Sequence, residues 1–286
     1  MSTAAYDSVS RFLLENLDIR GALVRLGPAW HEMRSRHAYA PPVRDLLGQL
    51  AAVTVLVAGN LKLPGRLTCQ LQGHGPVRLL VMDCDEQLRL RGLAKAPADQ
   101  APAALPELFG DGKLVLTLQT NVAAGRPYQS IVPLEGGSVG EVFEHFLENS
   151  EQTPTRLWLS ADEDHACGLF LQKLPEADAR DPDGWNRVLH LAGTVQPGEL
   201  ALPPEVLLKR LFAEEDLRLY EPRPVTYHCP RDEEKVLGML KSLGRAEVAE
   251  ALAEQGELKI RDDICQHEYR YGEEILDRLF PPRTLH

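Results

Sequence analysis

The feature that most constrains the fold is a strict alternation of apolar and polar residues that begins at Gly65. Leu67, Cys69 and Leu71 alternate with polar residues, a glycine-rich turn follows at residues 73–76, and a second apolar run comes after the turn. Successive side chains of a strand point to opposite faces, so the pattern predicts two antiparallel strands, each buried on one face. The chain therefore has to build a sheet and cover one side of it.

Further strands and helices are expected on both sides of this hairpin. Apolar residues at three- and four-residue spacing after Pro41-Pro42 predict a helix packed against a sheet. The expected strands cover residues 10–16, 19–26, 114–120 and 128–133, with a second hairpin at 158–174, and the expected helices cover residues 43–61 and 140–150. This order predicts an α+β fold, with a mainly antiparallel sheet and packed helices, for a first domain at residues 1–180.

The last third of the chain has a different character. Residues 185–215 are helical in pattern, but the prolines between Tyr220 and Val225 cannot continue a helix, so we expect a hinge there. Two helices at 232–243 and 245–255, a hairpin of strands 258–260 and 268–271, and a final helix at 272–280 are expected beyond it. The predicted organisation is a helical linker at residues 181–221 and a small C-terminal α/β module at residues 222–286.

Composition and charge exclude several classes of partner. The formal net charge of -11 and the pI near 5.3 give no basic surface for nucleic acid. The N-terminus lacks the basic segment and apolar core of a signal peptide, and the longest apolar run, Leu50 to Gly59, is too short to cross a bilayer. The five cysteines are odd in number and scattered. We therefore expect a cytoplasmic protein with mostly reduced thiols and no membrane partner.

The acidic turn Asp162 to His165, with Cys167 beside it, admits two interpretations. His165 and Cys167 are the residue types of a nucleophile pair, which would make the chain a thiol-dependent enzyme. Charge clusters between strands more often form solvated turns. The sequence contains no glycine-rich phosphate loop, nucleophile elbow or His-Glu-x-x-His helix. We therefore predict that the protein is not an enzyme, and we keep the Cys167/His165 enzyme as the alternative.

Soft metal donors recur in the C-terminal module. His228-Cys229 precedes its first helix, and Cys265-Gln266-His267 lies in its hairpin. Neither cysteine has a second cysteine within four residues, which zinc motifs usually have. The spacing alone leaves two alternatives open, an unusual zinc site or two unpaired thiols.

Several short stretches occur in an order that points to a family. They are Asp18-Ile19-Arg20-Gly21, Gln70-Leu71-Gln72-Gly73, Pro127-Tyr128-Gln129, Val132-Pro133-Leu134-Glu135-Gly136, Ser150-Glu151-Gln152 and Leu211-Phe212. Along almost its whole length the chain resembles the redox-regulated bacterial heat-shock chaperones called the 33 kDa chaperonin family. This resemblance implies an α+β first domain, a helical linker, and a C-terminal module whose Cys-x-Cys and Cys-x-x-Cys pairs bind zinc.

The sequence departs from the family pattern in that module. Cys229 and Cys265 match the second cysteine of each pair, whereas Tyr227 and Asp262 stand where the first cysteines belong. Structural zinc takes four ligands. The donors left for a metal are Cys229, Cys265, Asp262, His228 and His267. No cofactor is firmly expected, and zinc is the one candidate that the resemblance raises.

The resemblance implies an ATP-independent holdase that binds unfolded or misfolded client proteins under oxidative or heat stress and prevents their aggregation. A homodimer is implied for the active form. In the family, oxidation releases zinc, forms disulfide bonds within each pair, and unfolds the module and linker to expose apolar surface. Because both local pairs are missing here, we expect an altered redox switch: a disulfide between Cys229 and Cys265 would hold the module closed, unless both thiols stay free. An interaction adaptor without client capture is a further alternative.

Overall fold

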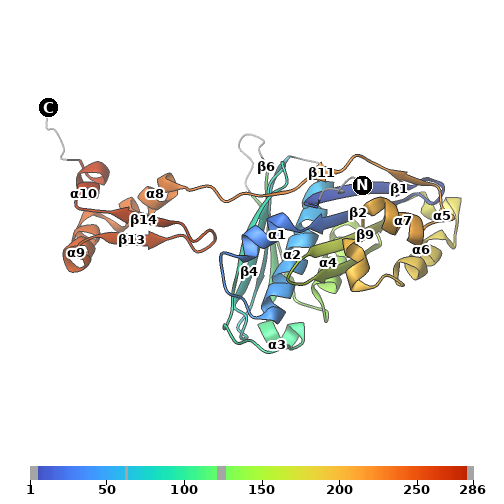
Figure 1. Ribbon diagram of the computed structural model, residues 1–286, viewed down its shortest axis with the longest axis horizontal. Coiled ribbons are helices and arrows are strands. Elements are labelled where there is room, and N and C mark those ends of the chain that lie inside the picture. Colours follow the sequence, from blue (N-terminus) through green and yellow to red (C-terminus); the bar gives the residue numbers. More distant parts are fainter. Residues whose placement is uncertain (1–5, 62–63, 121–126, 282–286) are drawn as a thin grey trace. The chain divides into compact units, whose positions relative to one another are not determined.

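Two sheets that enclose one long helix make up the larger part of the structure (Figure 1). The structure is a computed structural model that describes residues 6–61, 64–120 and 127–281. The chain divides into two units, Met1–His228 and Cys229–His286. Helices and mainly antiparallel strands occur in both, which confirms the predicted α+β fold class.

The first sheet belongs to the first unit and is antiparallel throughout its described strands. These are β1 (Ser8–Leu14), β2 (Ile19–Leu26), β8 (Thr155–Ala161), β9 (Ala166–Lys173), β10 (Leu217–Leu219) and β11 (Arg223–Pro224). Their order is β10-β1-β2-β9-β8, and β11 also pairs with β1. The predicted strands at 10–16 and 19–26 and the predicted second hairpin are confirmed as β1, β2 and β8–β9.

The second sheet contains the hairpin that the alternation predicted. Its described strands are β3 (Gly65–Gln72), β4 (Leu79–Cys84), β5 (Arg89–Lys95), β6 (Lys113–Thr120), β7 (Tyr128–Pro133) and β12 (Thr226–Tyr227). They follow the order β12-β5-β4-β3-β6-β7, and only the pairing of β12 with β5 is parallel. Leu67, Cys69 and Leu71 are buried, as the alternation requires.

Helix α2 (Pro41–Asn60) lies between the two sheets and fills the core of the first unit. Val43, Leu47 and Leu50 pack there against Val24 of the first sheet and Leu71 of the second. Among the described residues, α2 is the one helix long and apolar enough to span a membrane. The most apolar 18-residue stretch of this helix is 72% buried inside the protein. Packing in the core therefore explains why the helix is so apolar.

Shorter helices complete the first unit. They are α1 (Pro28–Arg34), α3 (Leu105–Phe109), α4 (Val139–Glu151), α5 (Ala177–Arg180), α6 (Gly184–Ala192) and α7 (Pro204–Leu211), with 3₁₀ turns η1 (Glu15–Leu17) and η2 (Pro197–Ala201). Ser138 caps α4, because its hydroxyl accepts a hydrogen bond from the amide of Glu141 at 3.2 Å. Helix α4 was predicted at 140–150, whereas α1 and α3 were not predicted.

The second unit has its own small core. It contains α8 (Glu233–Leu243), α9 (Arg245–Gln255), β13 (Leu258–Arg261), β14 (Glu268–Tyr271) and α10 (Glu274–Leu279). The buried residues that the three helices and the hairpin share are Leu240, Val248, Leu252, Leu258, Tyr269, Tyr271, Ile275 and Leu279. The predicted elements of the C-terminal module all form.

The division between the units falls after the segment expected to be a hinge. Arg223–Pro224 pairs with β1, and Thr226–Tyr227 pairs with β5, so the chain stays on the first unit as far as His228. The C-terminal unit therefore begins at Cys229 rather than at residue 222. A proline is compatible with such an edge strand because its missing amide is not needed for the ladder.

Candidate functional site

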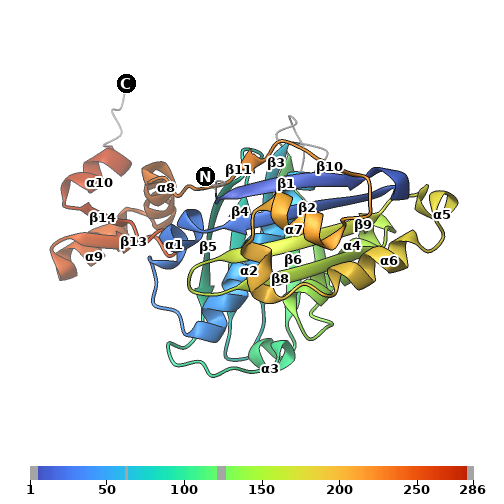
Figure 2. The same ribbon diagram turned by 45° about the vertical axis from the view of Figure 1, so that its right-hand side comes forward.

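The linker, residues 181–221, covers one face of the first sheet (Figure 2). Side chains of β2 alternate between two environments: Val24 faces α2, whereas Leu23 faces the linker. We call the second environment the linker cluster. From the sheet it contains Phe12, Leu14, Ile19, Leu23, Cys167, Leu169 and Leu171, and from the linker Val188, Ala192, Val195, Leu200, Leu207, Leu208, Leu211 and Phe212.

Packing of the linker cluster is close. Leu207 and Leu208 are fully buried, and the rings of Phe12 and Phe212 lie 6.1 Å apart. Each leucine that is buried in this way contributes about 1.5–3 kcal/mol. If the linker left the sheet, a contiguous apolar face built from β1, β2 and β9 would meet water.

Polar contacts also join the linker to the sheet: at its end, β10 pairs with β1 through main-chain hydrogen bonds, and the amide of Tyr220 donates to the Arg11 carbonyl at 2.9 Å. Arg25 of β2 donates from Nε to the carbonyl of Ala201 in η2 at 3.0 Å. Within the linker, Arg187 bonds both Asp181 and Glu215 at 2.9 Å, and these hydrogen bonds raise the pKa of Arg187. Helices α6 and α7 are thus held on the sheet mainly by apolar contacts, whereas β10 is held by its ladder with β1.

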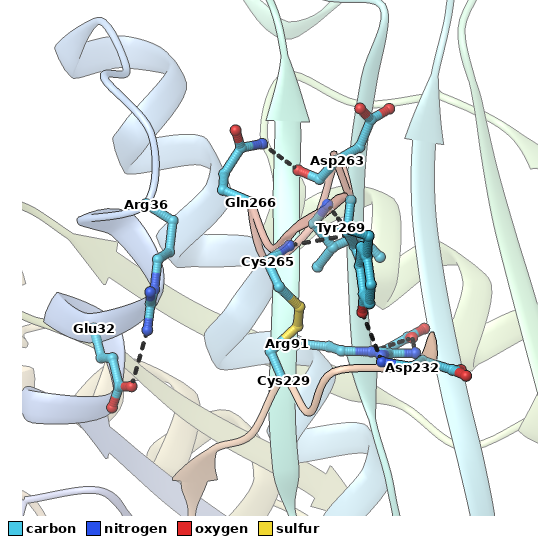
Figure 3. The surroundings of a disulfide bond; sticks show 12 residues. Glu32, Arg36, Arg91, Cys229, Asp232, Asp263, Cys265, Gln266 and Tyr269 are labelled. Carbon is cyan, nitrogen blue, oxygen red and sulfur yellow. Dashed lines mark hydrogen bonds and ion pairs between the residues drawn. A yellow bond between two sulfur atoms is a disulfide. The ribbon is translucent and has the colours of Figure 1, made fainter. Parts of the chain in front are cut away.

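Cys229 and Cys265 are the predicted site residues that the second unit brings together (Figure 3). Their Cα atoms are 5.9 Å apart, and the two side chains are joined as a disulfide. That Cα separation is the commonest one for disulfides. Beside the pair, the Tyr269 hydroxyl accepts a hydrogen bond from the Asp232 amide at 2.8 Å, which ties the start of α8 to β14.

Asp262 closes the turn that carries Cys265. Its Oδ1 accepts hydrogen bonds from the amides of Ile264 at 2.7 Å and Cys265 at 3.2 Å. The Asp262 amide in turn donates to the carbonyl of His267 at 2.9 Å. The carboxylate therefore shapes the turn through main-chain contacts, as aspartate commonly does two or three residues before such amides.

The remaining candidate positions are Tyr227, His228 and His267. Tyr227 is part of β12, and the amide of His228 donates to the Leu90 carbonyl at 3.0 Å, so both belong to the first unit. The Nδ1 atom of His267 is buried without a hydrogen-bond partner in the described part of the chain. Within residues 6–61, 64–120 and 127–281, no three His, Cys, Asp or Glu side chains lie close enough to hold one metal ion.

The donors therefore do not fit the four-ligand zinc site that the family resemblance implies. Two thiols and a carboxylate that bonds main-chain amides offer no closed tetrahedral set. The chemistry that this geometry supports is a disulfide across the second unit.

The alternative pair, Cys167 and His165, lacks the features of a nucleophilic site. Cys167 is buried under the linker, and burial raises the pKa of its thiol to about 12. His165 lies in the turn between β8 and β9, where its ring stacks on Tyr6 with centroids 5.0 Å apart. A thiol whose pKa is raised carries little thiolate, the reverse of what nucleophilic catalysis needs.

Comparison with known proteins extends over nearly the whole chain. A family model described as Hsp33 protein matches residues 7–272. The 33 kDa chaperonin of Methylobacillus flagellatus is 41% identical over 277 residues, covering 96% of this chain and 94% of that protein. The 33 kDa chaperonin of Nitrosococcus oceani is 40% identical over 275 residues, with the same coverage of both chains.

One solved structure shows the same fold. The crystal structure of the 33 kDa chaperonin (heat shock protein 33 homolog) from Thermotoga maritima matches with a TM-score of 0.83 at 22% sequence identity. The match covers 96% of this chain and 98% of that chain. The fold is therefore shared over most of the chain.

Proposed function

The chain belongs to the Hsp33 family of chaperones, and from that premise we propose that it is an ATP-independent holdase. A holdase binds unfolding proteins and keeps them from aggregating without refolding them. The clients that we propose are unfolded or misfolded proteins during heat or oxidative stress. Client binding through apolar surface requires no active-site residues, so we propose no enzymatic activity.

The observation that carries this proposal is the linker cluster. A broad apolar face of the first sheet is complete without the linker, because its strands are held by the ladders and by the core on their other side. Exposed apolar patches of this kind bind proteins. Unfolding clients expose apolar side chains, which can replace the linker residues on that face.

The linker would act as the regulator of that face. Its own helices are short, α6 having 9 residues and α7 having 8, and helices of this length are marginal when isolated in water. They are stable only while packed on the sheet. We expect a modest rise in temperature to release these helices before the two-sheet core unfolds, since short elements at the surface of a domain open before its core.

The cysteine pair supplies a second level of control. We propose that oxidation joins Cys229 to Cys265 and stabilises the second unit, so that a redox response is weak or opposite to that of the family. The 5.9 Å separation of the two Cα atoms supports the bond, and the poor fit to zinc supports a switch without metal. Zinc analysis of the reduced protein tests the second point, and we expect much less than one zinc ion per chain.

We further propose that the protein acts in the cytoplasm, as a homodimer when active, without membrane or nucleic-acid partners. The acidic net charge of -11 supports the exclusion of nucleic acid. The burial of α2 supports the exclusion of a membrane span.

The decisive experiment follows light scattering by a heat-labile test protein, without ATP, over a range of temperatures. Limited proteolysis of residues 181–221 in the same samples reports linker release. We expect aggregation to be suppressed from the temperature at which the linker becomes accessible. If a folded protein with a released linker fails to suppress aggregation at equimolar ratio, the proposed function is wrong.

A further inference from the structure

Arg25 is a charged residue buried beneath the linker. It follows Leu23 by two positions on β2, so its side chain points to the same, linker-covered face. Only 3% of the residue is exposed. Across the interface with the linker, Arg25 donates a hydrogen bond from Nε to the Ala201 carbonyl, and on its own side its guanidinium carbon lies 4.4 Å from the centroid of the Tyr6 ring.

The compensation of this charge is incomplete. A guanidinium has five N–H donors and stays protonated in proteins. In the described part of the chain no carboxylate pairs with Arg25, and its Nη1 atom is buried without any hydrogen-bond partner. The neighbour directly opposite on β9 is Cys167, a buried thiol.

An unpaired buried cation is costly. Removing a charged side chain from water costs several kcal/mol even after the protein relaxes, whereas one hydrogen bond and one cation–π contact return only part of that amount. The cost arises when the linker docks, because Ala201 and the linker cluster close over Arg25. Release of the linker returns the guanidinium to water.

We propose that Arg25 destabilises the docked linker and thereby sets the temperature at which the client-binding face opens. This inference rests on the proposed function, for which it names the regulating residue. The apolar contacts of the linker cluster favour docking, and the buried charge opposes it. The balance keeps the linker closed at low temperature and ready to leave when the temperature rises.

In the opposite role, Arg25 would stabilise the docked linker through its hydrogen bond to Ala201. The two roles predict opposite signs for a substitution that removes the charge and keeps the length. Arg25→Met is that substitution, because an unbranched apolar chain fills the same space. Arg25→Lys keeps the charge and loses the planar group that bonds Ala201.

The experiment measures amide hydrogen exchange in η2 and α7 of the full chain, together with the onset temperature of aggregation suppression. Arg11→Met is the matched control, since Arg11 is exposed on β1 and its neighbours Ser10 and Phe12 point to the other face. Amides of α2, in the core, report in the same spectra whether the fold is intact.

In Arg25→Met we expect exchange in η2 and α7 to slow by about fivefold or more, with a higher onset temperature. Arg25→Lys should not slow exchange, and Arg11→Met should match the wild type. Faster or unchanged exchange in Arg25→Met, or loss of its fold, would overturn the inference. Slower exchange without a change in onset temperature would support the role of Arg25 and contradict the linker's role in the proposed function.

Discussion

The thiols of the first unit lie in its packed interior. Cys69 and Cys84 belong to the core around α2, and Cys167 packs under the linker. Burial raises the pKa of Cys69 and of Cys167 to about 12, and it raises the pKa of Cys84 as well. Because the thiolate is the reactive form, these residues should be inert in the native protein.

Alkylation of the reduced, native protein at pH 8 checks this expectation. At that pH the thiols of Cys69, Cys84 and Cys167 remain protonated, since burial holds their pKa values far above it, so iodoacetamide should leave these three unmodified and react with the partly exposed Cys229. Protein unfolded in guanidinium serves as the control and should be modified at every cysteine. Modification of native Cys167 at the rate of the unfolded chain would revive the enzyme hypothesis.

Only some of the site residues can be predicted from the sequence. The proximity of Cys229 and Cys265 came from the family resemblance, because 36 residues separate them and spacing alone does not bring them together. The turn-forming role of Asp262 has a local signal that was missed, since aspartate often accepts amides two and three residues later. Arg25 has no such signal, because its burial depends on Ala201, which lies 176 residues further along the chain.

At the scale of elements, substitutions in α7 test whether docking of the linker controls aggregation suppression. Leu208 is fully buried in the linker cluster, whereas Val206 on the same helix is 52% exposed. Leu208→Ala should cost the docked linker about 2–5 kcal/mol, the usual range for a buried leucine. Protease sensitivity within residues 181–221 and the onset of aggregation suppression should both move to lower temperature.

Val206→Ala is the matched control for that variant. It removes methyl groups from the solvent-facing side of the same helix, so both onset temperatures should stay within error of the wild type. If Leu208→Ala loosens the linker while chaperone activity still begins at the wild-type temperature, the client face lies somewhere else.

Most helices and strands were predictable because their periodicity is strong. The alternation of β3 and the three- and four-residue spacing of α2 each specify one structure. Strands β11 and β12 were not predicted, since each has two residues and exists only through its partner in β1 or β5. The prolines near Tyr220 exclude a helix, but they do not exclude an edge strand.

At the scale of the whole molecule, the cysteine pair belongs to the second unit and the proposed client face belongs to the first. A chain that ends at His228 keeps both sheets, α2 and the linker, and should fold around its own core. Its aggregation suppression should have the same temperature dependence in dithiothreitol and in peroxide, because its remaining cysteines are buried. A redox response in this shortened chain would place the sensor in the first unit.

The final prediction concerns oxidation of the full chain. A disulfide between Cys229 and Cys265 closes a loop across a sequence separation of 36 residues, and the chain-entropy estimate gives a stabilisation of about 4 kcal/mol at most. A unit this small has little apolar core, so a covalent link has a large effect on its stability. Oxidation should therefore slow amide exchange in β13 and β14.

The two units can be followed separately in that experiment. Trp30, Trp158 and Trp185 all lie in the first unit, so tryptophan fluorescence reports its unfolding, while amide exchange in the hairpin reports the second unit. Cys265→Ser is the control and should show no effect of peroxide on the hairpin. Oxidation that instead speeds exchange in β13 and β14 and starts aggregation suppression would show that the switch opens as in the family. Because the bond joins residues within one unit, its formation should leave the tryptophan signal of the first unit unchanged.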